Sequence, residues 1–276
     1  MRTRIDMSTA ESPAVTVASL RRMKAAGERI ACLTAYDASF ARVLDEAGVE
    51  VLLVGDSLGM LIGGHATTIP VTMDDMVYHG RAVARGCRRA LLVVDMPFMS
   101  YATPEQALRN AARLMQEGGA RAVKLEGGRT QAETVRQLAE RGIPVCAHLG
   151  LQPQSVHKLG GYRVQGRAPE AARAMVEDAR ALEAAGADLM VLECVPSTLA
   201  RAITAAVAIP VIGIGAGPGC DGQVLVLYDA LGITPGRVPR FARNFLTDGR
   251  DVAGAVRAFV EAVKAGTFPG PEHELG

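Results

Sequence analysis

Aromatic residues are scarce in this sequence, at 4% of the chain, and neither sign of charge is in clear excess. The chain has 30 lysines and arginines against 29 aspartates and glutamates, which gives a formal net charge of +1. Surfaces that bind nucleic acid need positive charge and, for single strands, aromatic rings that stack on bases. The composition therefore predicts no nucleic-acid partner and no electrostatic attraction to an anionic membrane.

Long hydrophobic segments are also missing. The longest nearly apolar run, residues 205–219, is interrupted by Pro210 and four glycines and is too short to span a bilayer. The N-terminus, MRTRIDMSTAESP, has no apolar core of signal-peptide length. The five cysteines are scattered and never spaced C-x-x-C, which argues against a disulfide framework and a zinc knuckle and favours reduced thiols. We therefore expect a cytoplasmic protein with no membrane partner.

Two common catalytic motifs are absent, and a third is incomplete. No Gly-Lys dipeptide occurs, which excludes a P-loop, and the histidines form no H-E-x-x-H arrangement. The glycine-rich stretch GIGAGPG (213–219) fails the dinucleotide-binding pattern G-x-G-x-x-G because Pro218 takes the last position. A backbone cradle for an anion and a tight turn both remain open for this stretch.

Eight short apolar runs alternate with longer amphipathic stretches, and near-continuous apolar runs are typical of parallel strands that are covered on both faces. The runs are residues 30–37, 49–57, 89–97, 120–128, 143–150, 187–195, 209–217 and 222–230. Helix-capping residues begin several of the stretches between them, at Thr72, Thr103 and Thr130. Eight strand-then-helix units predict an α/β protein with a single (β/α)8 TIM barrel.

The expected barrel forms one catalytic domain over residues 17–276, preceded by a flexible N-terminal segment at residues 1–16. An extra N-terminal helix is predicted at residues 17–28 and a closing helix at residues 251–265. The connection between the seventh and eighth strands is too short for a full helix, so we expect that unit to be irregular.

Polar side chains gather where the predicted strands end, at Asp37, Asp56, Asp95, Glu126, His148 and Glu193. In a TIM barrel these ends meet at one mouth, where barrel enzymes place their chemistry. Any single acid among them can instead cap the helix that follows its strand. Five acids at one rim repel one another unless a cation lies among them, and oxygen ligands suit Mg2+. The pattern favours a magnesium site over a purely structural cluster of charges.

Lysine is rare in this chain, and Lys124 stands two residues before Glu126 on a predicted strand, so both side chains leave the same face. Burying an ammonium group without a partner is costly, which makes a structural role unusual. One interpretation is a buried ion pair between Lys124 and Glu126. The other is a cation that holds an anionic substrate beside a carboxylate linked to the metal.

Glu193 follows the apolar run LMVL, a setting that suits a general base, although a helix-capping role is the alternative. His148 ends the segment AHLG and can donate to a carboxylate, or it can be a core histidine whose hydrogen bonds are satisfied. Cys194 is next to the proposed base, where a small buried hydrophobic residue is the simplest interpretation.

Several segments resemble the ketopantoate hydroxymethyltransferase family, and the resemblance covers about residues 17–265 in order. The segments VGDSLGM (54–60), DMPFMSY (95–101) and LGGYRVQGR (159–167) are specific to that family rather than to barrels in general. Further matching segments are LTAYDASFARVLDEAG (33–48), PVTMDDMVYH (70–79), VKLEGG (123–128), PVCAHLGLQPQS (144–155), VLECVP (191–196) and residues 210–233.

The resemblance implies transfer of a one-carbon unit from 5,10-methylenetetrahydrofolate to the 2-keto acid 3-methyl-2-oxobutanoate. The product is 2-dehydropantoate, an intermediate of pantothenate biosynthesis, and the reaction passes through a Mg-stabilised enolate. It also implies a homo-oligomer, often a decamer. By position in the matching motifs, Asp56, Asp95 and Glu126 are the Mg2+ ligands, directly or through water, and Glu193 is the proton acceptor. Asp56, Ser57, Asp95, Lys124 and His148 are the implied substrate-binding residues.

Three positions depart from the family pattern: Ala66 stands where an acid is common, His157 where asparagine is common and Tyr228 where histidine is common. Two other interpretations compete with the resemblance. A Mg-dependent carbon–carbon lyase or mutase of the isocitrate lyase and phosphoenolpyruvate mutase group typically carries a K-[KR]-C-G-H loop, and no such segment occurs here. A barrel that binds keto acids or folate without catalysis would be expected to have lost one of the charged site residues. All five are present, namely Asp56, Asp95, Lys124, Glu126 and Glu193.

Overall fold

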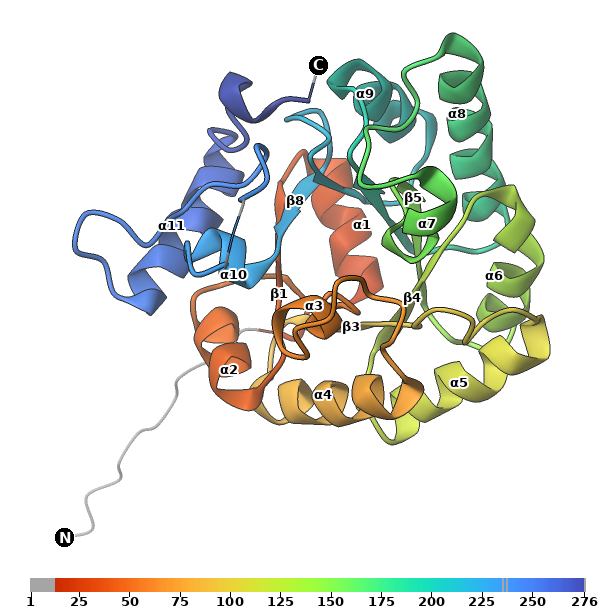
Figure 1. The fold of residues 1–276 in the computed structure, drawn as a ribbon, viewed down its shortest axis with the longest axis horizontal. Coiled ribbons are helices and arrows are strands. Elements are labelled where there is room, and N and C mark those ends of the chain that lie inside the picture. Colours follow the sequence, from red (N-terminus) through yellow and green to blue (C-terminus); the bar gives the residue numbers. More distant parts are fainter. Residues whose placement is uncertain (1–12, 235, 237, 276) are drawn as a thin grey trace, which may run out of the picture.

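The computed structural model describes residues 13–275 except 235 and 237, and the chain folds into a closed barrel of eight parallel strands (Figure 1). The strands pair in sequence order, and β1 pairs with β8 to close the barrel. They are β1 (Ile30–Thr34), β2 (Val51–Val54), β3 (Leu91–Asp95), β4 (Ala122–Glu126), β5 (Val145–Gly150), β6 (Leu189–Glu193), β7 (Val211–Ile214) and β8 (Gly222–Leu225). Each lies within one of the eight predicted apolar runs, so the predicted TIM barrel is confirmed.

The helices follow the strands and surround the barrel. They are α1 (Val17–Ala26), α2 (Ala38–Glu46), α3 (Leu58–Leu61), α4 (Met73–Gly86), α5 (Pro104–Gln116), α6 (Ala132–Ala139), α7 (Val156–Leu159), α8 (Pro169–Ala184), α9 (Ser197–Ala206), α10 (Leu227–Ala230) and α11 (Val252–Ala265). Three short 3-10 turns add η1 (Arg129–Gln131), η2 (Pro153–Ser155) and η3 (Pro271–His273). The predicted extra helix is α1 and the predicted closing helix is α11. No helix lies between β7 and β8 in this fully described stretch, as predicted.

Side-chain caps define where five of these helices begin, namely α1, α2, α4, α5 and α11. The Thr72 and Thr103 hydroxyls accept hydrogen bonds from the third backbone N–H of α4 and α5, as the sequence predicts. The cap predicted at Thr130 is wrong, because this residue lies inside the turn η1 and α6 begins after it without a side-chain cap. The sequence pattern gave no sign that a 3-10 turn would take up those residues.

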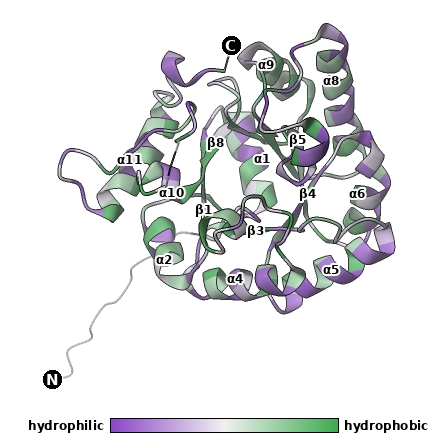
Figure 2. Cartoon of the chain, viewed as in Figure 1, coloured by the Kyte–Doolittle hydropathy of each residue, from purple (hydrophilic) through white to green (hydrophobic). Residues whose placement is uncertain are grey.

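Two hydrophobic layers form the core, one inside the barrel and one between the strands and the helices. The strands that separate them are coloured mostly as hydrophobic in Figure 2. Side chains alternate between these layers along each strand, so that Val51 and Leu53 face the barrel interior while Leu52 and Val54 face the helices. Because both faces are covered, the strands are apolar almost throughout. The polar residues left at their carboxyl ends therefore stand out against an apolar wall.

Helix α1 lies against the amino-terminal end of the barrel. Leu20 of this helix belongs to the same hydrophobic cluster as the barrel interior. Lys24 donates to the carbonyls of Thr204, Val207 and Ile209, which precede β7, and pairs with Asp221, which precedes β8. These contacts close one end of the barrel and leave the opposite mouth for the site.

The predicted flexible segment at residues 1–16 falls largely on residues 1–12, which lie outside the described residues. Within the described ranges, no helix combines the length and the apolar character needed to cross a membrane.

Candidate active site

A cavity of about 710 Å³ opens at the carboxyl ends of the strands. Its inner wall carries the polar residues Asp56, Ser57, Asp95, Lys124, Glu126, His148 and Glu193. Its outer wall is mostly apolar and includes Met60, Tyr162, Val226, Phe241 and Leu275. All seven residues that the sequence analysis assigned to metal, substrate or catalysis therefore line the same cavity.

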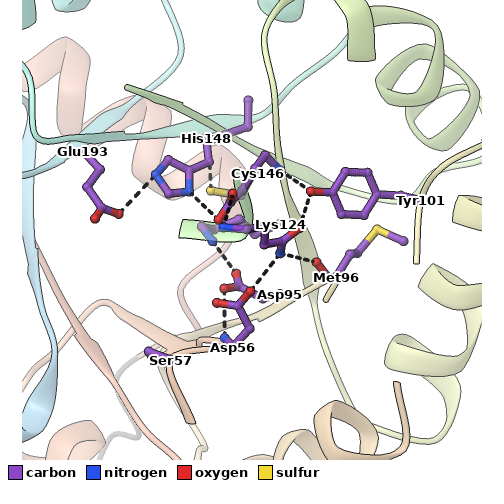
Figure 3. A network of polar contacts seen from close by, with 12 residues as sticks. Asp56, Ser57, Asp95, Met96, Tyr101, Lys124, Cys146, His148 and Glu193 are labelled. Atoms are coloured by element: carbon purple, nitrogen blue, oxygen red, sulfur yellow. Dashed lines mark hydrogen bonds and ion pairs between the residues drawn. The ribbon is translucent and has the colours of Figure 1, made fainter. Parts of the chain in front are cut away.

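Three carboxylates and one ammonium group meet at the inner end of this cavity (Figure 3). Asp95 and Glu126 are the last residues of β3 and β4, and Asp56 follows β2 by two positions. Asp95 Oδ1 lies 2.7 Å from Lys124 Nζ, and Asp95 Oδ2 accepts a hydrogen bond from the Asp56 backbone N–H at 3.1 Å. All four side chains are deeply buried. The ion pair that Lys124 forms is thus with Asp95, not with Glu126 as one interpretation of the sequence supposed.

The pKa values in this cluster depend on burial and on the excess of carboxylates over the single ammonium group of Lys124. Burial, and next the charge of Asp95, raise the pKa of Asp56 to about 7, against the opposing effects of Lys124 and Gln154. Burial and the charge of Asp56 likewise raise the pKa of Glu126 well above its usual range. Burial alone would lower the pKa of Lys124, but the three surrounding carboxylates outweigh it and raise that pKa, so the ammonium stays charged.

The donor set fits a hard divalent cation. Glu126 Oε1 is buried and accepts no hydrogen bond from the described residues, and within that part of the chain Lys124 is the one ammonium group that faces the three carboxylates. Among the described residues, however, no three His, Cys, Asp or Glu side chains are placed to ligate one ion together. Mg2+ commonly binds through one or two carboxylates and keeps several waters. Asp56, Asp95 and Glu126 can therefore hold Mg2+ in that manner, with part of the set acting through water.

His148 lies between two carboxylates in the same wall (Figure 3). Its Nδ1 is 3.6 Å from Glu126 Oε1 and its Nε2 is 3.3 Å from Glu193 Oε2, and neither ring nitrogen forms a hydrogen bond with the described residues. Burial and the nearby Lys124 charge lower the pKa of His148, which favours the neutral ring. A neutral imidazole carries one N–H, so it can donate to only one of the two acids at a time.

Glu193 ends β6 and lies at the wall of the cavity with a side chain that is 17% exposed. It does not cap the next helix, because Pro196 is the residue before α9 and Glu193 lies three positions earlier. The following residue, Cys194, has φ +47, in the left-handed region that is rare for residues other than glycine, and its side chain is buried. The chain therefore turns sharply just after Glu193, which leaves the carboxylate facing the cavity.

Ser57 and Asp37 both follow strands, but Ser57 lines the cavity whereas Asp37 caps a helix. The Ser57 hydroxyl lines the cavity and lies 2.9 Å from the Tyr36 hydroxyl. For Asp37 the helix-capping alternative of the sequence analysis holds. This residue caps α2, where one carboxylate oxygen accepts hydrogen bonds from the backbone N–H groups of Ser39 and Phe40, and it is not among the residues that line the cavity.

Two functional candidates escaped the sequence analysis. Gln154 in η2 and Tyr101 in the loop after β3 are buried beside the carboxylates and are hydrogen bonded to each other and to the cluster. Both lie in segments that carried the family resemblance, but nothing in their spacing marked them as partners of the acids.

The three departures from the family pattern lie away from the carboxylates. Ala66 and His157 are exposed and do not line the cavity. Tyr228 packs edge-on against Tyr36, with ring centroids 5.9 Å apart, and Tyr36 in turn contacts Ser57.

Comparison with known proteins gives a consistent result. The sequence model of the ketopantoate hydroxymethyltransferase family matches residues 14–271. A protein of Halorhodospira halophila is 61% identical over 268 residues, which cover 97% of each chain. A protein of Alkalilimnicola ehrlichii is 62% identical over 262 residues, which cover 95% of each chain. Both are named 3-methyl-2-oxobutanoate hydroxymethyltransferase.

Solved structures with the same fold are more distant in sequence. A phosphonopyruvate hydrolase in complex with oxalate and Mg2+ has a TM-score of 0.59 at 14% identity, covering 79% of this chain and 83% of that one. A 2,3-dimethylmalate lyase of the phosphoenolpyruvate mutase and isocitrate lyase superfamily has a TM-score of 0.55 at 20% identity, covering 80% of this chain and 82% of that one. At these identities the likeness establishes the fold alone.

Proposed function

The chain belongs to the ketopantoate hydroxymethyltransferase family, and from that premise we propose that it transfers a hydroxymethyl group from 5,10-methylenetetrahydrofolate to 3-methyl-2-oxobutanoate. Water supplies the oxygen of the new hydroxyl group, tetrahydrofolate leaves, and the product is 2-dehydropantoate, an intermediate of pantothenate biosynthesis. The observation that carries the proposal is one cavity with a buried carboxylate cluster at its inner end and a separate carboxylate, Glu193, on its wall.

The inner cluster is suited to the carboxylate and carbonyl oxygens of the keto acid. Asp56, Asp95 and Glu126 would hold Mg2+, which when bound acts as a Lewis acid that lowers the free energy of an enolate. Lys124 keeps its charge beside Asp95 and adds a positive potential where the anionic substrate binds. The Ser57 hydroxyl, positioned by Tyr36, is available to donate to a substrate oxygen. Because these groups are buried, their interactions are weakly screened by water.

Glu193 is the proposed general base that removes the C3 proton of the keto acid. Its carboxylate borders the cavity and His148 Nε2 lies 3.3 Å from it, so the neutral ring can orient the base without adding a charge. In this arrangement the base and the carboxylate cluster lie on opposite sides of His148. The substrate carbon that loses its proton would face Glu193 while its carbonyl end is held by the inner cluster.

The outer part of the cavity supports the folate co-substrate. A keto acid of about eight non-hydrogen atoms fills little of a site of this size, because cavities of roughly 300–1,000 Å³ hold drug-sized ligands. The remaining space is bordered by Tyr162, Phe241 and Leu275, together with Arg163 and Arg240. An aromatic ring system such as a pterin could pack there and bring its one-carbon unit to the enolate.

A Mg-dependent lyase or mutase remains the alternative reaction for this fold, and the likeness to such enzymes reaches only the fold. Incubating the protein with 3-methyl-2-oxobutanoate, 5,10-methylenetetrahydrofolate and Mg2+ separates the two. We expect 2-dehydropantoate in a one-to-one ratio with tetrahydrofolate, and no product when EDTA removes the metal. Cleavage of 2,3-dimethylmalate or phosphonopyruvate, with no product from the folate reaction, would refute the proposal.

The proposed assembly rests on the family resemblance, and the proposed location rests on the N-terminal sequence and the scattered cysteines. We propose a homo-oligomer, a decamer by family resemblance, located in the cytoplasm. Light scattering coupled to size-exclusion chromatography would measure the assembly, and a mass of one 29.0 kDa chain would contradict it.

A further inference from the structure

We propose that Gln154 is a positioning residue for the metal site, because it fixes one oxygen of Asp56 and one oxygen of Glu126 and leaves the remaining donors for the cation. This inference rests on the proposed metal site. Gln154 lies in η2 after β5 and is 5% exposed, so its contacts form in a dry environment. It is 98 residues from Asp56 in the sequence.

Both donor hydrogens and the oxygen of the Gln154 side chain form hydrogen bonds inside this cluster. Its Nε2 donates to Asp56 Oδ2 at 2.8 Å and to the Met96 carbonyl at 2.9 Å. Its Oε1 accepts from the Tyr101 hydroxyl at 2.6 Å. An amide has two donor hydrogens and an acceptor oxygen, and each of them is matched here.

The direction of these hydrogen bonds is determined by the partners. The Tyr101 oxygen receives the Glu126 backbone N–H at 3.3 Å, so the Tyr101 proton is directed to Gln154 Oε1. Both partners of Nε2 are acceptors, so a flipped amide would place its oxygen against a carboxylate and a carbonyl. The chain from Glu126 through Tyr101 and Gln154 to Asp56 therefore runs in one direction and ends by donating to the Asp56 carboxylate.

The same residue also holds Glu126. The Gln154 backbone N–H donates to Glu126 Oε2 at 3.1 Å, while Glu126 Oε1 stays buried without a hydrogen-bond partner. One residue thus fixes an oxygen on each of two acids that come from different strands. Partners of this kind orient metal ligands, and their loss typically lowers metal affinity about 10- to 100-fold.

The test replaces Gln154 by methionine, which keeps the length of the side chain and the backbone N–H that donates to Glu126, and removes the side-chain hydrogen bonds to Asp56, Met96 and Tyr101. Mn2+ binding to the substrate-free protein, followed by electron paramagnetic resonance, should weaken about 10- to 100-fold in Gln154→Met. Tyr101→Phe removes one hydrogen bond of the network and should weaken Mn2+ binding about two- to tenfold. The C3–H exchange rate of 3-methyl-2-oxobutanoate in Gln154→Met should recover toward the wild-type rate as Mg2+ is raised, which a general loss of structure would not allow.

A matched control is Gln223→Met. Gln223 is a second buried glutamine, donates to the Gly217 carbonyl and lies on β8, where Val224 rather than Gln223 faces the barrel interior. We expect it to bind Mn2+ like the wild type.

The outcomes separate this inference from the proposed function. Wild-type affinity in both Gln154→Met and Tyr101→Phe would overturn the positioning role while leaving the metal site intact. An equal loss in Gln223→Met would also overturn it, since the effect would then be general. No Mn2+ binding by the wild type would overturn the metal site itself. Should Gln154→Met fail to fold, Tyr101→Phe decides the question.

Discussion

Replacing Lys124 by methionine removes the single ammonium group that faces three buried carboxylates. Lys124 Nζ is 2.7 Å from Asp95 Oδ1, and both side chains are at most 5% exposed. Methionine fills a similar volume, so the main effect is electrostatic. Asp95 would be left as a buried charge without its partner, next to Asp56, whose pKa is already raised to about 7.

Removing one partner of a buried ion pair typically costs about 3–5 kcal/mol of folding free energy. At this chain length about 2 °C of Tm corresponds to each kcal/mol, so we expect Lys124→Met to melt roughly 6–10 °C below the wild type at pH 8 in EDTA. Lys124 opposes the raised pKa values of Asp56 and Glu126, so without the ammonium these two values rise further above those of the unfolded chain. The folded state then binds more protons than the unfolded state, so stability falls as the pH rises. The deficit in Tm should therefore be smaller at pH 5.5 than at pH 8.

Thermal unfolding followed by circular dichroism at both pH values measures this difference. Excess Mg2+ should raise the Tm of Lys124→Met more than that of the wild type, because the cation replaces the missing positive charge. The double variant Lys124→Met with Asp95→Asn is the control, and it should be more stable than Lys124→Met alone, since neither partner is then left as an uncompensated charge. A Lys124→Met variant with the wild-type Tm at pH 8 would refute the claim that the cluster is ionised and short of positive charge.

Three further predictions concern the competition between protons and Mn2+ at Asp56, the outer part of the cavity, and Asp37, which caps α2. The pKa of Asp56 in the metal-free protein is about 7, so below that pH Mn2+ must displace a proton to bind. The apparent Kd for Mn2+ should therefore fall about tenfold from pH 6 to pH 8. A Kd that does not change over this range would contradict the raised pKa. Phe241→Ala should raise the KM for methylenetetrahydrofolate about tenfold in steady-state kinetics and leave the rate of folate-free C3–H exchange, measured by proton NMR, unchanged. A slower C3–H exchange of the same size as the loss in folate kinetics would show that Phe241 contacts the keto acid instead. Asp37→Ala removes the cap of α2 and should lower the unfolding free energy, measured by urea titration, by about 1 kcal/mol without changing turnover. A large drop in turnover would show that Asp37 takes part in the reaction.

The barrel was predictable because its strands are covered on both faces, which forces near-continuous apolar runs such as VLLV in β2 and LLVV in β3. The polar residues that interrupt this pattern at the strand ends then had to face the mouth. Asp56, Asp95 and Glu126 could be assigned to the mouth for that reason, and they do line the cavity. Their proposed roles with Mg2+ and substrate stay predictions.

Local sequence could not separate a capping acid from a site acid. Asp37 lies three residues after β1 in an extended conformation, where its carboxylate reaches the first N–H groups of α2. The partner of Lys124 was equally hidden. Glu126 is the acid nearest in sequence on the same strand, but Asp95 is the residue directly opposite Lys124 on β3, and neighbouring strands are closer than alternate residues of one strand.

The residues around the acids could not be predicted because they depend on how loops fold. Gln154 reaches Asp56 only because the loop after β5 turns back over the mouth in η2. Tyr101 reaches Gln154 from another loop, 53 residues away in sequence. A contact between two loops leaves no periodicity in the sequence, so only the structure reveals this part of the site.

In the proposed reaction Glu193 removes the C3 proton of the keto acid while the carboxylate cluster, with Mg2+, stabilises the resulting charge. Proton NMR of 3-methyl-2-oxobutanoate in D2O with Mg2+ and without folate measures this step directly. The wild type should exchange the C3 proton in a metal-dependent manner, and Glu193→Gln should slow the exchange about 10²- to 10⁴-fold while binding Mn2+ normally. Exchange of the C3 proton by Glu193→Gln at the wild-type rate would contradict the assignment of Glu193 as the base, because another group would then remove the proton.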